Sequence, residues 1–202
     1  MFFFKIISHL FHPLLFSFLG TFLYLVLTPK HIVKKQEYVI LIIIFISTYI
    51  LPVFVLALLK RMNMIQSYKL DTIEERKFPI LFFIILSFMI GNLLINIHIV
   101  DLLAYSFYGT AISLCFTYIL FSAKIKTSLH TLGIGGILSF VIIMSFEYKL
   151  NYNLIIAFLF ILSGLIAVSR LALKAHQPKE IYIGFLVGMI SQLISYQFYH
   201  NI

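Results

Sequence analysis

Three polar stretches in an otherwise apolar chain carry the residue types that phosphate chemistry needs. They read KLDTIEERKFP, KTSLHTLG and SRLALKAHQPKE. Arg and Lys side chains bind phosphate oxygens, and imidazole, which titrates near neutrality, can serve as nucleophile or acid. Cations, a nucleophile and an acid for the leaving oxygen are the parts of a phosphoryl-transfer site. The candidate residues are Lys69, Arg76, Ser128, His130, Arg170, His176 and Glu180.

The third stretch also predicts local structure around its histidine. Pro178 suits the first position of a helix, which puts His176 just before that helix and Glu180 in its first turn. Glu180 would then orient His176 and stabilise its charge, and the helix N-terminus would face the phosphate. For any single Arg, anchoring to lipid headgroups at the interface is the alternative reading.

Composition places these stretches in a membrane protein. The chain has 202 residues, of which 62% are hydrophobic and 11% charged, and its mean hydropathy is +1.07. These values exclude an ordinary soluble domain. We expect one membrane domain over 1–202, with no nucleic acid partner. The single Cys115 allows neither a disulfide framework nor a thiolate metal cluster.

The apolar runs predict an all-α, polytopic membrane helix bundle of six or seven transmembrane helices, because they are too long for transmembrane strands and do not alternate. The first run is interrupted by His9, His12 and Pro13, and it could instead be interfacial or re-entrant, which would leave six spans. His9 and His12 could pair as metal ligands, but without a third ligand nearby we expect polar packing. The predicted spans are 6–28, 38–59, 79–97, 102–122, 130–146, 152–169 and 181–198.

Alternation of seven spans puts the three polar stretches and the N-terminus on one side of the membrane. That side holds eleven of the fifteen Lys and Arg residues. The positive-inside rule therefore predicts a cytoplasmic location for these loops. The GxxxG spacing of Gly184 and Gly188 favours a close helix crossing in the last span.

The third stretch resembles a known family motif. Ser169 and Arg170, five residues, His176, three residues and then Glu180 follow the SRx5Hx3D signature of the type 2 phosphatidic acid phosphatase (PAP2) superfamily, with Glu in place of Asp. Gly184 and Gly188 follow at the spacing common in that family.

The other two stretches resemble the remaining PAP2 motifs in the family's order. Ser128 and His130 stand where PSGH would lie, although Thr127 replaces its Pro and Leu129 replaces its Gly. Lys69 and Arg76 match Kx6RP, although Lys77 replaces its Pro. The resemblance covers about 69–190, and the first two spans carry no motif.

The resemblance implies a lipid phosphatase that needs neither cofactor nor metal. His176 would attack phosphorus to form a phosphohistidine, and His130 would protonate the leaving group. Lys69, Arg76 and Arg170 would hold the phosphate, with Ser128 assisting. The substrate would be a lipid phosphomonoester or pyrophosphate, such as polyprenyl pyrophosphate or phosphatidic acid, in a bacterial inner membrane. Many bacterial members of the family have their site on the periplasmic face, so the resemblance and the charge count favour opposite sides. The alternative is a membrane protein that binds or transports an anionic lipid without turnover.

Overall fold

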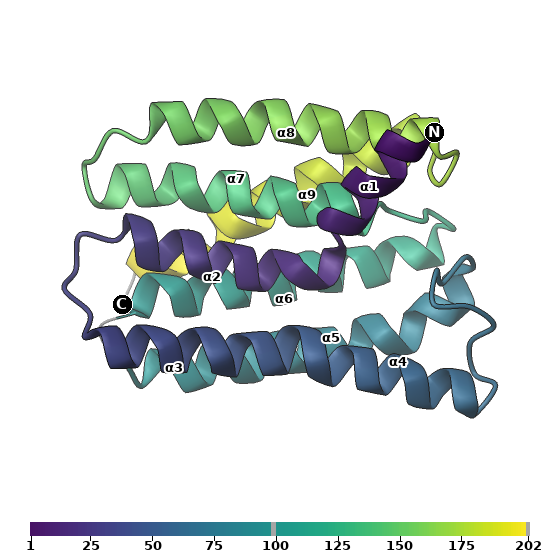
Figure 1. Ribbon diagram of the computed structural model, residues 1–202, viewed down its shortest axis with the longest axis horizontal. Helices are drawn as coiled ribbons and strands as arrows, with labels where there is room; N and C mark the ends of the chain where they lie inside the picture. The colour runs from purple at the N-terminus through teal and green to yellow at the C-terminus, as the bar shows by residue number, and fades with distance from the viewer. Residues whose placement is uncertain (98–99, 201–202) are drawn as a thin grey trace.

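The computed structural model describes residues 1–97 and 100–200, and this part of the chain contains helices and no strands. The long helices lie side by side along the longest axis of the molecule (Figure 1). A single 3₁₀ turn, η1 (Pro13–Leu15), and a π-helical turn, η2 (Ile46–Ile50), interrupt the first two spans. The helices are α1 (Phe2–Leu10), α2 (Phe16–Leu27), α3 (Lys34–Phe45), α4 (Leu51–Arg61), α5 (Ile73–Ile95), α6 (Asp101–Ser122), α7 (Leu129–Glu147), α8 (Asn153–Ala172) and α9 (Pro178–His200).

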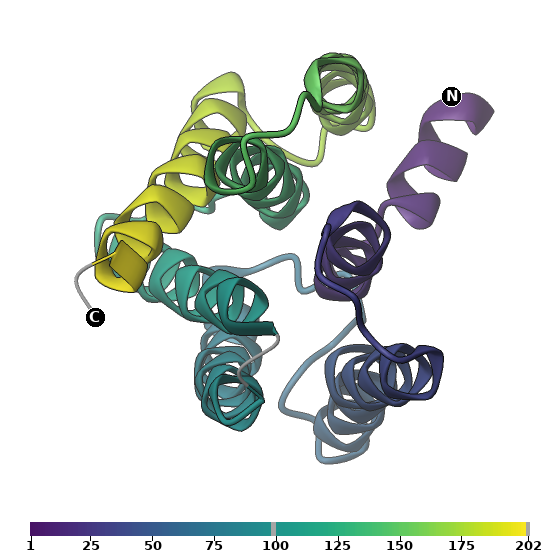
Figure 2. The same ribbon diagram turned by 90° about the vertical axis from the view of Figure 1, so that its left-hand side faces the viewer.

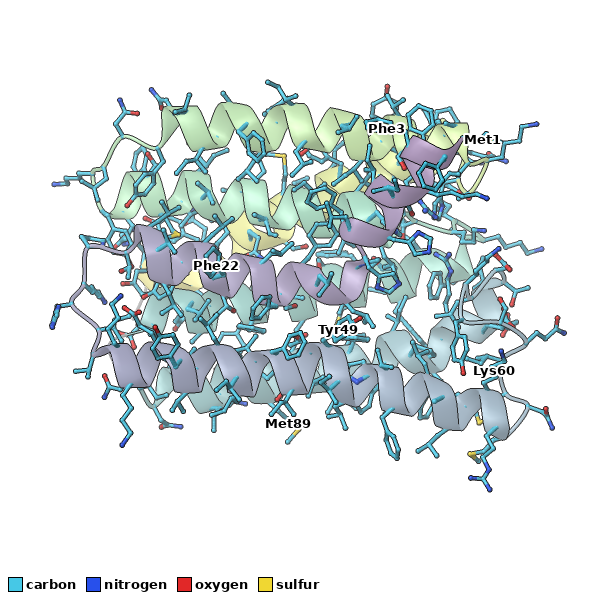
Figure 3. The ribbon with its side chains drawn as sticks, in the orientation of Figure 1. Met1, Phe3, Phe22, Tyr49, Lys60 and Met89 are labelled. Carbon is cyan, nitrogen blue, oxygen red and sulfur yellow. The ribbon has the colours of Figure 1, made fainter. Side chains whose placement is uncertain are left out.

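The prediction of an all-α membrane bundle is confirmed. Within the described residues, seven helical segments are long and apolar enough to cross a membrane, and they correspond to the seven predicted spans. Large apolar side chains point outward along the bundle, as Phe22 and Met89 do with 47% and 62% of their surface exposed (Figure 3). Such an apolar exterior is suited to lipid, so the chain is an integral membrane protein.

The first span departs from a simple straight helix. Pro13 has no N–H to donate, so the helix cannot continue through it. His12 is extended (φ −65°, ψ 140°), and its ring nitrogen accepts a hydrogen bond from the backbone of Leu14 at the start of η1. As a result α1 turns away from the axis of α2 (Figure 2) and packs against α8.

The third span begins earlier than the apolar pattern predicts. Its helix α5 starts at Ile73 rather than near 79, because Thr72 and Glu75 form a capping box. Thr72 accepts a hydrogen bond from the backbone of Glu75, and the carboxylate of Glu75 accepts one from the backbone of Thr72. The charged first turn of α5 therefore carries Arg76 into the bundle.

The last helix crosses α7 closely, as the GxxxG spacing predicted. A methyl group on Gly184 would lie 2.7 Å from the carbonyl oxygen of Ser128, and one on Gly188 would lie 2.1 Å from that of Leu132. Both are well inside van der Waals contact, so only glycine permits this approach. The crossing fixes the start of α9 beside the start of α7.

Candidate active site

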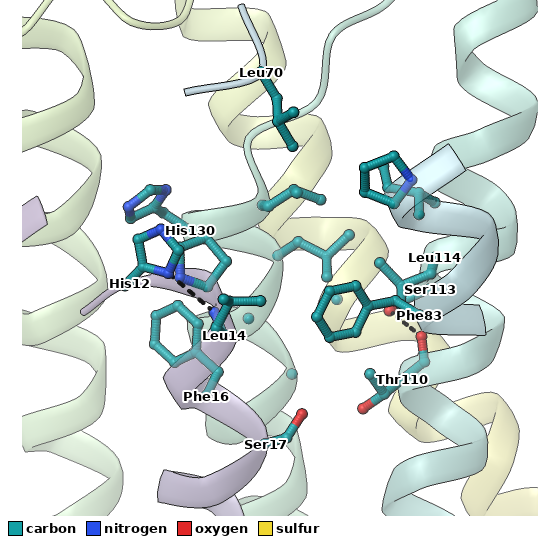
Figure 4. A pocket seen from close by; sticks show the side chains of 18 of the residues that line it. His12, Leu14, Phe16, Ser17, Leu70, Phe83, Thr110, Ser113, Leu114 and His130 are labelled. Atoms are coloured by element: carbon teal, nitrogen blue, oxygen red, sulfur yellow. Dashed lines mark hydrogen bonds between the residues drawn. The ribbon is translucent and has the colours of Figure 1, made fainter. Parts of the chain in front are cut away.

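A cavity of about 860 Å³ lies between the N-terminal helices and α5, α6, α7 and α9. Apolar side chains line much of it, including Phe16, Phe83 and Leu114 (Figure 4). Polar residues from the predicted loops line the end of the cavity near the starts of α5, α7 and α9. Those residues are Lys69, Arg76, Lys126, His130, Arg170, Lys174 and His176, together with Lys5, Ser8, His9, His12 and Asp71.

The loop before α7 joins the three stretches through its backbone. The carbonyl oxygen of Lys126 lies 3.1 Å from Nδ1 of His176. The carbonyl oxygen of Thr127 accepts a 3.2 Å hydrogen bond from Nη1 of Arg76, and the backbone N–H of Ser128 donates to the carbonyl oxygen of Glu180 at 3.1 Å. Segments about 50 residues apart in sequence therefore meet at one loop.

His176 is held in one tautomer. Its Nδ1 lies 2.9 Å from Oε2 of Glu180 as well as 3.1 Å from the Lys126 carbonyl. Both partners are acceptors, so Nδ1 carries the proton. Within the described residues Nε2 makes no hydrogen bond, and its lone pair is available to an electrophile in the cavity.

The environment also keeps His176 neutral. Burial lowers the pKa of His176 from its ordinary 6.5 to about 4; the hydrogen bond to Glu180 opposes this shift, while the charges of Arg76 and Arg170 add to it. The side chain is therefore uncharged at neutral pH, which is the state a nucleophilic imidazole requires.

Glu180 sits where the sequence predicted, in the first turn of α9, which begins at Pro178. Its Oε2 also accepts a 3.1 Å hydrogen bond from the backbone N–H of Gln177. The carboxylate thus satisfies an otherwise free donor at the helix start while it holds His176. Although Glu is one methylene longer than Asp, it reaches the imidazole here at hydrogen-bonding distance.

Arg76 is almost completely buried, with 7% of its surface exposed. Its Nε donates to the carbonyl oxygen of Leu70 at 2.8 Å, in addition to the bond from Nη1 to Thr127. Leu70 adopts a left-handed backbone conformation (φ 51°), which turns the chain just before α5. Two backbone carbonyls therefore fix the guanidinium at the wall of the cavity.

Arg170 and His130 are linked through the N-terminal helix. Nη1 of Arg170 donates to the hydroxyl of Ser8, and Nε2 of His130 lies 3.2 Å from the Ser8 carbonyl oxygen and 3.4 Å from its hydroxyl. The preceding residue, Ser169, donates its hydroxyl to the carbonyl oxygen of Phe4 at 2.9 Å. Two consecutive residues of α8 thus hold α1 in place.

Of the two remaining predicted residues, Lys69 is exposed and Ser128 is buried. Lys69 is exposed at the cavity wall, and its amine has no hydrogen-bond partner within the described residues. Ser128 is fully buried, and its hydroxyl accepts from the backbone N–H of Thr131 at the start of α7. Its side chain is therefore engaged in capping the helix.

Sequence reasoning did not assign Ser8, His12 or Lys126 to the site. The ring of His12 lies 6.1 Å from that of His130, edge to face, and both rings stand on the same side of the cavity (Figure 4). Lys126 contributes a backbone carbonyl, which leaves no trace in a side-chain pattern. The available signal for the N-terminal residues was the polar cluster in the first span, since polar groups in a membrane segment require partners.

Comparison with known proteins yields one match. The family model described as the PAP2 superfamily matches residues 111–202, from within α6 to the end of the chain. This match confirms the resemblance drawn from the second and third motifs, while the first motif at Lys69 and Arg76 lies outside it. Neither the curated proteins nor the solved structures gave a match.

Proposed function

Since residues 111–202 belong to the PAP2 superfamily, whose members generally hydrolyse phosphate esters, we propose that this chain is a membrane lipid phosphatase. It cleaves a lipid phosphomonoester or pyrophosphate through a phosphohistidine on Nε2 of His176. The observation that carries the proposal is the state of His176, whose Nδ1 is fixed by Glu180 while Nε2 stays free beside a cationic cavity wall.

In the first step, the Nε2 lone pair of His176 attacks phosphorus, a bond forms between nitrogen and phosphorus, and the bond to the leaving oxygen breaks. The leaving oxygen takes a proton from His130, which donates it from its charged form. The proton on Nδ1 of His176 stays in its hydrogen bond to Glu180, whose negative charge offsets the positive charge on the phosphorylated ring.

In the second step, water replaces the lipid alcohol or lipid phosphate. His130, now neutral, takes a proton from the water as its oxygen attacks phosphorus. The bond between phosphorus and Nε2 breaks, inorganic phosphate leaves, and His176 returns to its initial state. His130 regains its proton, so the two histidines complete a cycle without net change.

Fixed cations stabilise the transferring group in both steps. Arg76 and Arg170 present guanidinium groups to the cavity, and Lys69 adds an exposed ammonium group. Backbone carbonyls fix Arg76 and Ser8 fixes Arg170, so little reorganisation of the two guanidinium groups is needed when charge develops on the equatorial oxygens. Ser128 contributes through the start of α7 rather than through its buried hydroxyl.

The apolar part of the same cavity gives the lipid a place to lie. It extends from the cationic end past Phe83 and Leu114 to Phe107 and Phe140, which belong to the main buried core. A hydrocarbon chain there leaves water, while its phosphate meets the loops. This arrangement supports a lipid substrate over a small soluble phosphate ester.

The experiment that tests the proposal traps the intermediate. Rapid acid-free quenching during turnover of a ³²P-labelled lipid phosphate should yield label bound to protein that is stable in base, labile in acid and located at His176 by mass spectrometry. His130→Ala should slow an alkyl phosphate by about 10²-fold or more and p-nitrophenyl phosphate much less, because an aryl leaving group needs little protonation.

One result would refute the enzymatic function, and another would refute only the role of His130. The wild-type protein would release no phosphate from polyprenyl pyrophosphate, phosphatidic acid or p-nitrophenyl phosphate and would still bind anionic lipid. That result favours the lipid-binding alternative. Equal losses in His130→Ala on alkyl and aryl substrates would instead remove its role as acid.

We also propose that the site faces the cytoplasm of a bacterial cell, because the end of the bundle that holds it carries eleven of the fifteen Lys and Arg residues. In a Cys115→Ser background, Gln66→Cys beside the site should resist an impermeant maleimide in intact cells. His31→Cys at the opposite end should react. The reverse pattern would place the site outside the cytoplasm.

A further inference from the structure

The break in the first span leaves backbone groups of α1 without helical partners. Because α1 ends at Leu10 and both Phe11 and His12 leave the helical conformation, the carbonyl of Ser8 is one of the last four in its helix and has no intrahelical donor. A carbonyl in this position accepts a hydrogen bond from elsewhere when one is offered. Here it faces Nε2 of His130 at 3.2 Å.

The hydroxyl of the same residue is engaged by a second site residue. Nη1 of Arg170 donates to Ser8 Oγ, and that oxygen lies 3.4 Å from Nε2 of His130. One serine thus contacts a guanidinium with its side chain and an imidazole with both its side chain and its backbone. The contact is firmly held, because Ser169 binds the Phe4 carbonyl one turn earlier in α1.

On the basis of the phosphatase function proposed above, we propose that Ser8 is a positioning residue that fixes the tautomer of His130. The fixed tautomer leaves Nδ1 as the nitrogen that exchanges protons with substrate and water. The Ser8 carbonyl can only accept, so it retains a proton on Nε2 whether His130 is neutral or charged. Within the described residues Nδ1 of His130 makes no hydrogen bond, and the ring lines the cavity.

The two histidines therefore react through different ring nitrogens. Glu180 fixes Nδ1–H on His176 and frees Nε2 for attack. Ser8 fixes Nε2–H on His130 and frees Nδ1 for proton transfer. A neutral backbone carbonyl suits the second role, because a carboxylate there would hold the imidazolium proton more tightly and oppose its transfer to the leaving group.

The proposal also gives α1 a function in the site. In α1 several exposed residues are large and apolar, with Phe2 79% and Leu10 62% exposed, while Ser8 is turned toward His130. Lipid contact on one side and the bonds to Ser169 and Arg170 on the other keep the helix against α8. The N-terminal segment thereby completes a site whose motifs all lie after residue 68.

The tautomer can be measured directly. In the full-length protein with ¹⁵N-labelled histidine, above the pH at which the ring is charged, the shifts of His130, assigned with His130→Gln, should report Nε2–H and an unprotonated Nδ1. A neutral ring protonated on Nδ1 would overturn the proposal, whether or not the protein hydrolyses any phosphate.

Kinetics test the role in turnover. Ser8→Ala keeps the carbonyl but removes the hydroxyl through which Arg170 holds it against His130. The variant should lower kcat on an alkyl phosphate by about 10-fold, the loss expected from one hydrogen bond to a charged group, and should lower it less on p-nitrophenyl phosphate. Ser8→Thr keeps the hydroxyl and should restore most of the alkyl activity. Ser122→Ala is the matched control, because Ser122 donates its hydroxyl to the carbonyl oxygen of Ile119 in its own helix and does not line the cavity.

Several outcomes separate this inference from the function on which it rests. Equal losses in Ser8→Ala on both substrates, or no loss on either, would overturn the positioning role while leaving the phosphatase intact. If Ser8→Ala does not fold, the comparison of wild type with Ser8→Thr and the tautomer measurement decide. If the wild-type protein hydrolyses no phosphate ester, the proposed function fails. The NMR measurement of the His130 tautomer then remains as the test of the contact between Ser8 and His130.

Discussion

The C-terminal helices α5–α9 and the N-terminal helices α1–α4 are built differently around the same cavity. In α7, at the centre of the C-terminal part, 72% of the apolar span is buried in protein, whereas the span formed by α3 and α4 is only 22% buried. Glycines let α9 approach the backbone of α7, but α4 meets the rest of the bundle mainly through α5. Within the C-terminal part, α7 and α6 (50% buried) are packed largely against protein, whereas the other spans of both parts, which are 22% to 33% buried, largely face lipid.

This difference indicates how rigidity is distributed. Residues proposed to do chemistry stand at helix ends that the close α7–α9 crossing fixes, and backbone groups of Lys126, Thr127 and Ser128 tie them together. The N-terminal helices close the cavity and contribute side chains to its wall. Catalytic groups require tightly fixed geometry, whereas a wall around a lipid chain tolerates looser packing.

The largest difference in activity is expected between variants of His176 and His12, which line the same cavity from the C-terminal and the N-terminal part. His176→Ala removes the proposed nucleophile, so turnover should fall by more than about 10³-fold on alkyl and aryl phosphates alike. His12→Ala, from the N-terminal part, should leave most of the activity. Phosphate release by the two variants measures the contrast, and comparable losses in both would erase the distinction drawn between the two parts.

A pH profile sharpens the assignment within the C-terminal part. Neutral His176 is the reactive form and its pKa is lowered to about 4, so kcat/KM on p-nitrophenyl phosphate should rise with pH through about 4 and show no step from this residue near 6.5. Glu180 raises this pKa, so Glu180→Gln should move the acid limb to lower pH. The lost charge should also reduce kcat by about 10- to 100-fold.

Glu147→Gln is the control for that profile. Glu147 lies at the opposite end of the bundle, where its carboxylate accepts a hydrogen bond from Tyr196, and it does not line the cavity. Its replacement should leave the acid limb where it is in wild type. A limb that moves upward in Glu180→Gln would contradict the arrangement of His176 and Glu180.

Close packing in the C-terminal part can be probed with a pair of glycines. Gly188→Ala puts a methyl group 2.1 Å from the Leu132 carbonyl oxygen, a backbone atom that cannot move aside. Thermal unfolding in detergent should show a loss of about 1–3 kcal/mol. Gly164→Ala meets nothing within 4 Å and should be neutral or slightly stabilising. Equal stability of the two variants would show that the crossing is more pliable than its geometry indicates.

The smallest effect is expected from the wall that the N-terminal part provides. Leu56 of α4 lines the cavity, so Leu56→Ala should weaken tail binding and raise KM for a lipid phosphate by about threefold to tenfold, with kcat on p-nitrophenyl phosphate unchanged. Leu58, which is 41% exposed and does not line the cavity, gives the matched control Leu58→Ala. A change in kcat on the small substrate would give α4 a role in chemistry.

Much of the fold follows from sequence pattern. The seven apolar runs predicted the seven spans because bilayer thickness fixes the length of a helix that crosses it. Boundaries were less accurate where local polar groups act: Thr72 and Glu75 start α5 early, and His12 with Pro13 divide the first span. Hydropathy does not register capping or the direction a chain takes after a break.

The gathering of the three stretches followed from alternation of spans and from ordered motifs. Motif spacing placed His176 and Glu180 one helical turn apart, which their 2.9 Å hydrogen bond reflects. Ser8 could not be predicted, because its contribution depends on a helix end and on contacts with residues more than 120 positions away. Ser128 was expected to assist in holding the phosphate, and its burial and capping bond were visible only in three dimensions.

The sequence by itself determined that the chain is a helical membrane protein, and it predicted which loops share a membrane face and which side chains would hold and attack phosphate. Those properties depend on hydrophobicity, charge and spacing along one dimension. Only the tertiary structure decided which nitrogen of each histidine is free, which carbonyls fix Arg76, and that α1 reaches the site. These are properties of backbone atoms brought together by packing, and every residue type has the same backbone carbonyl, so no residue pattern encodes them directly.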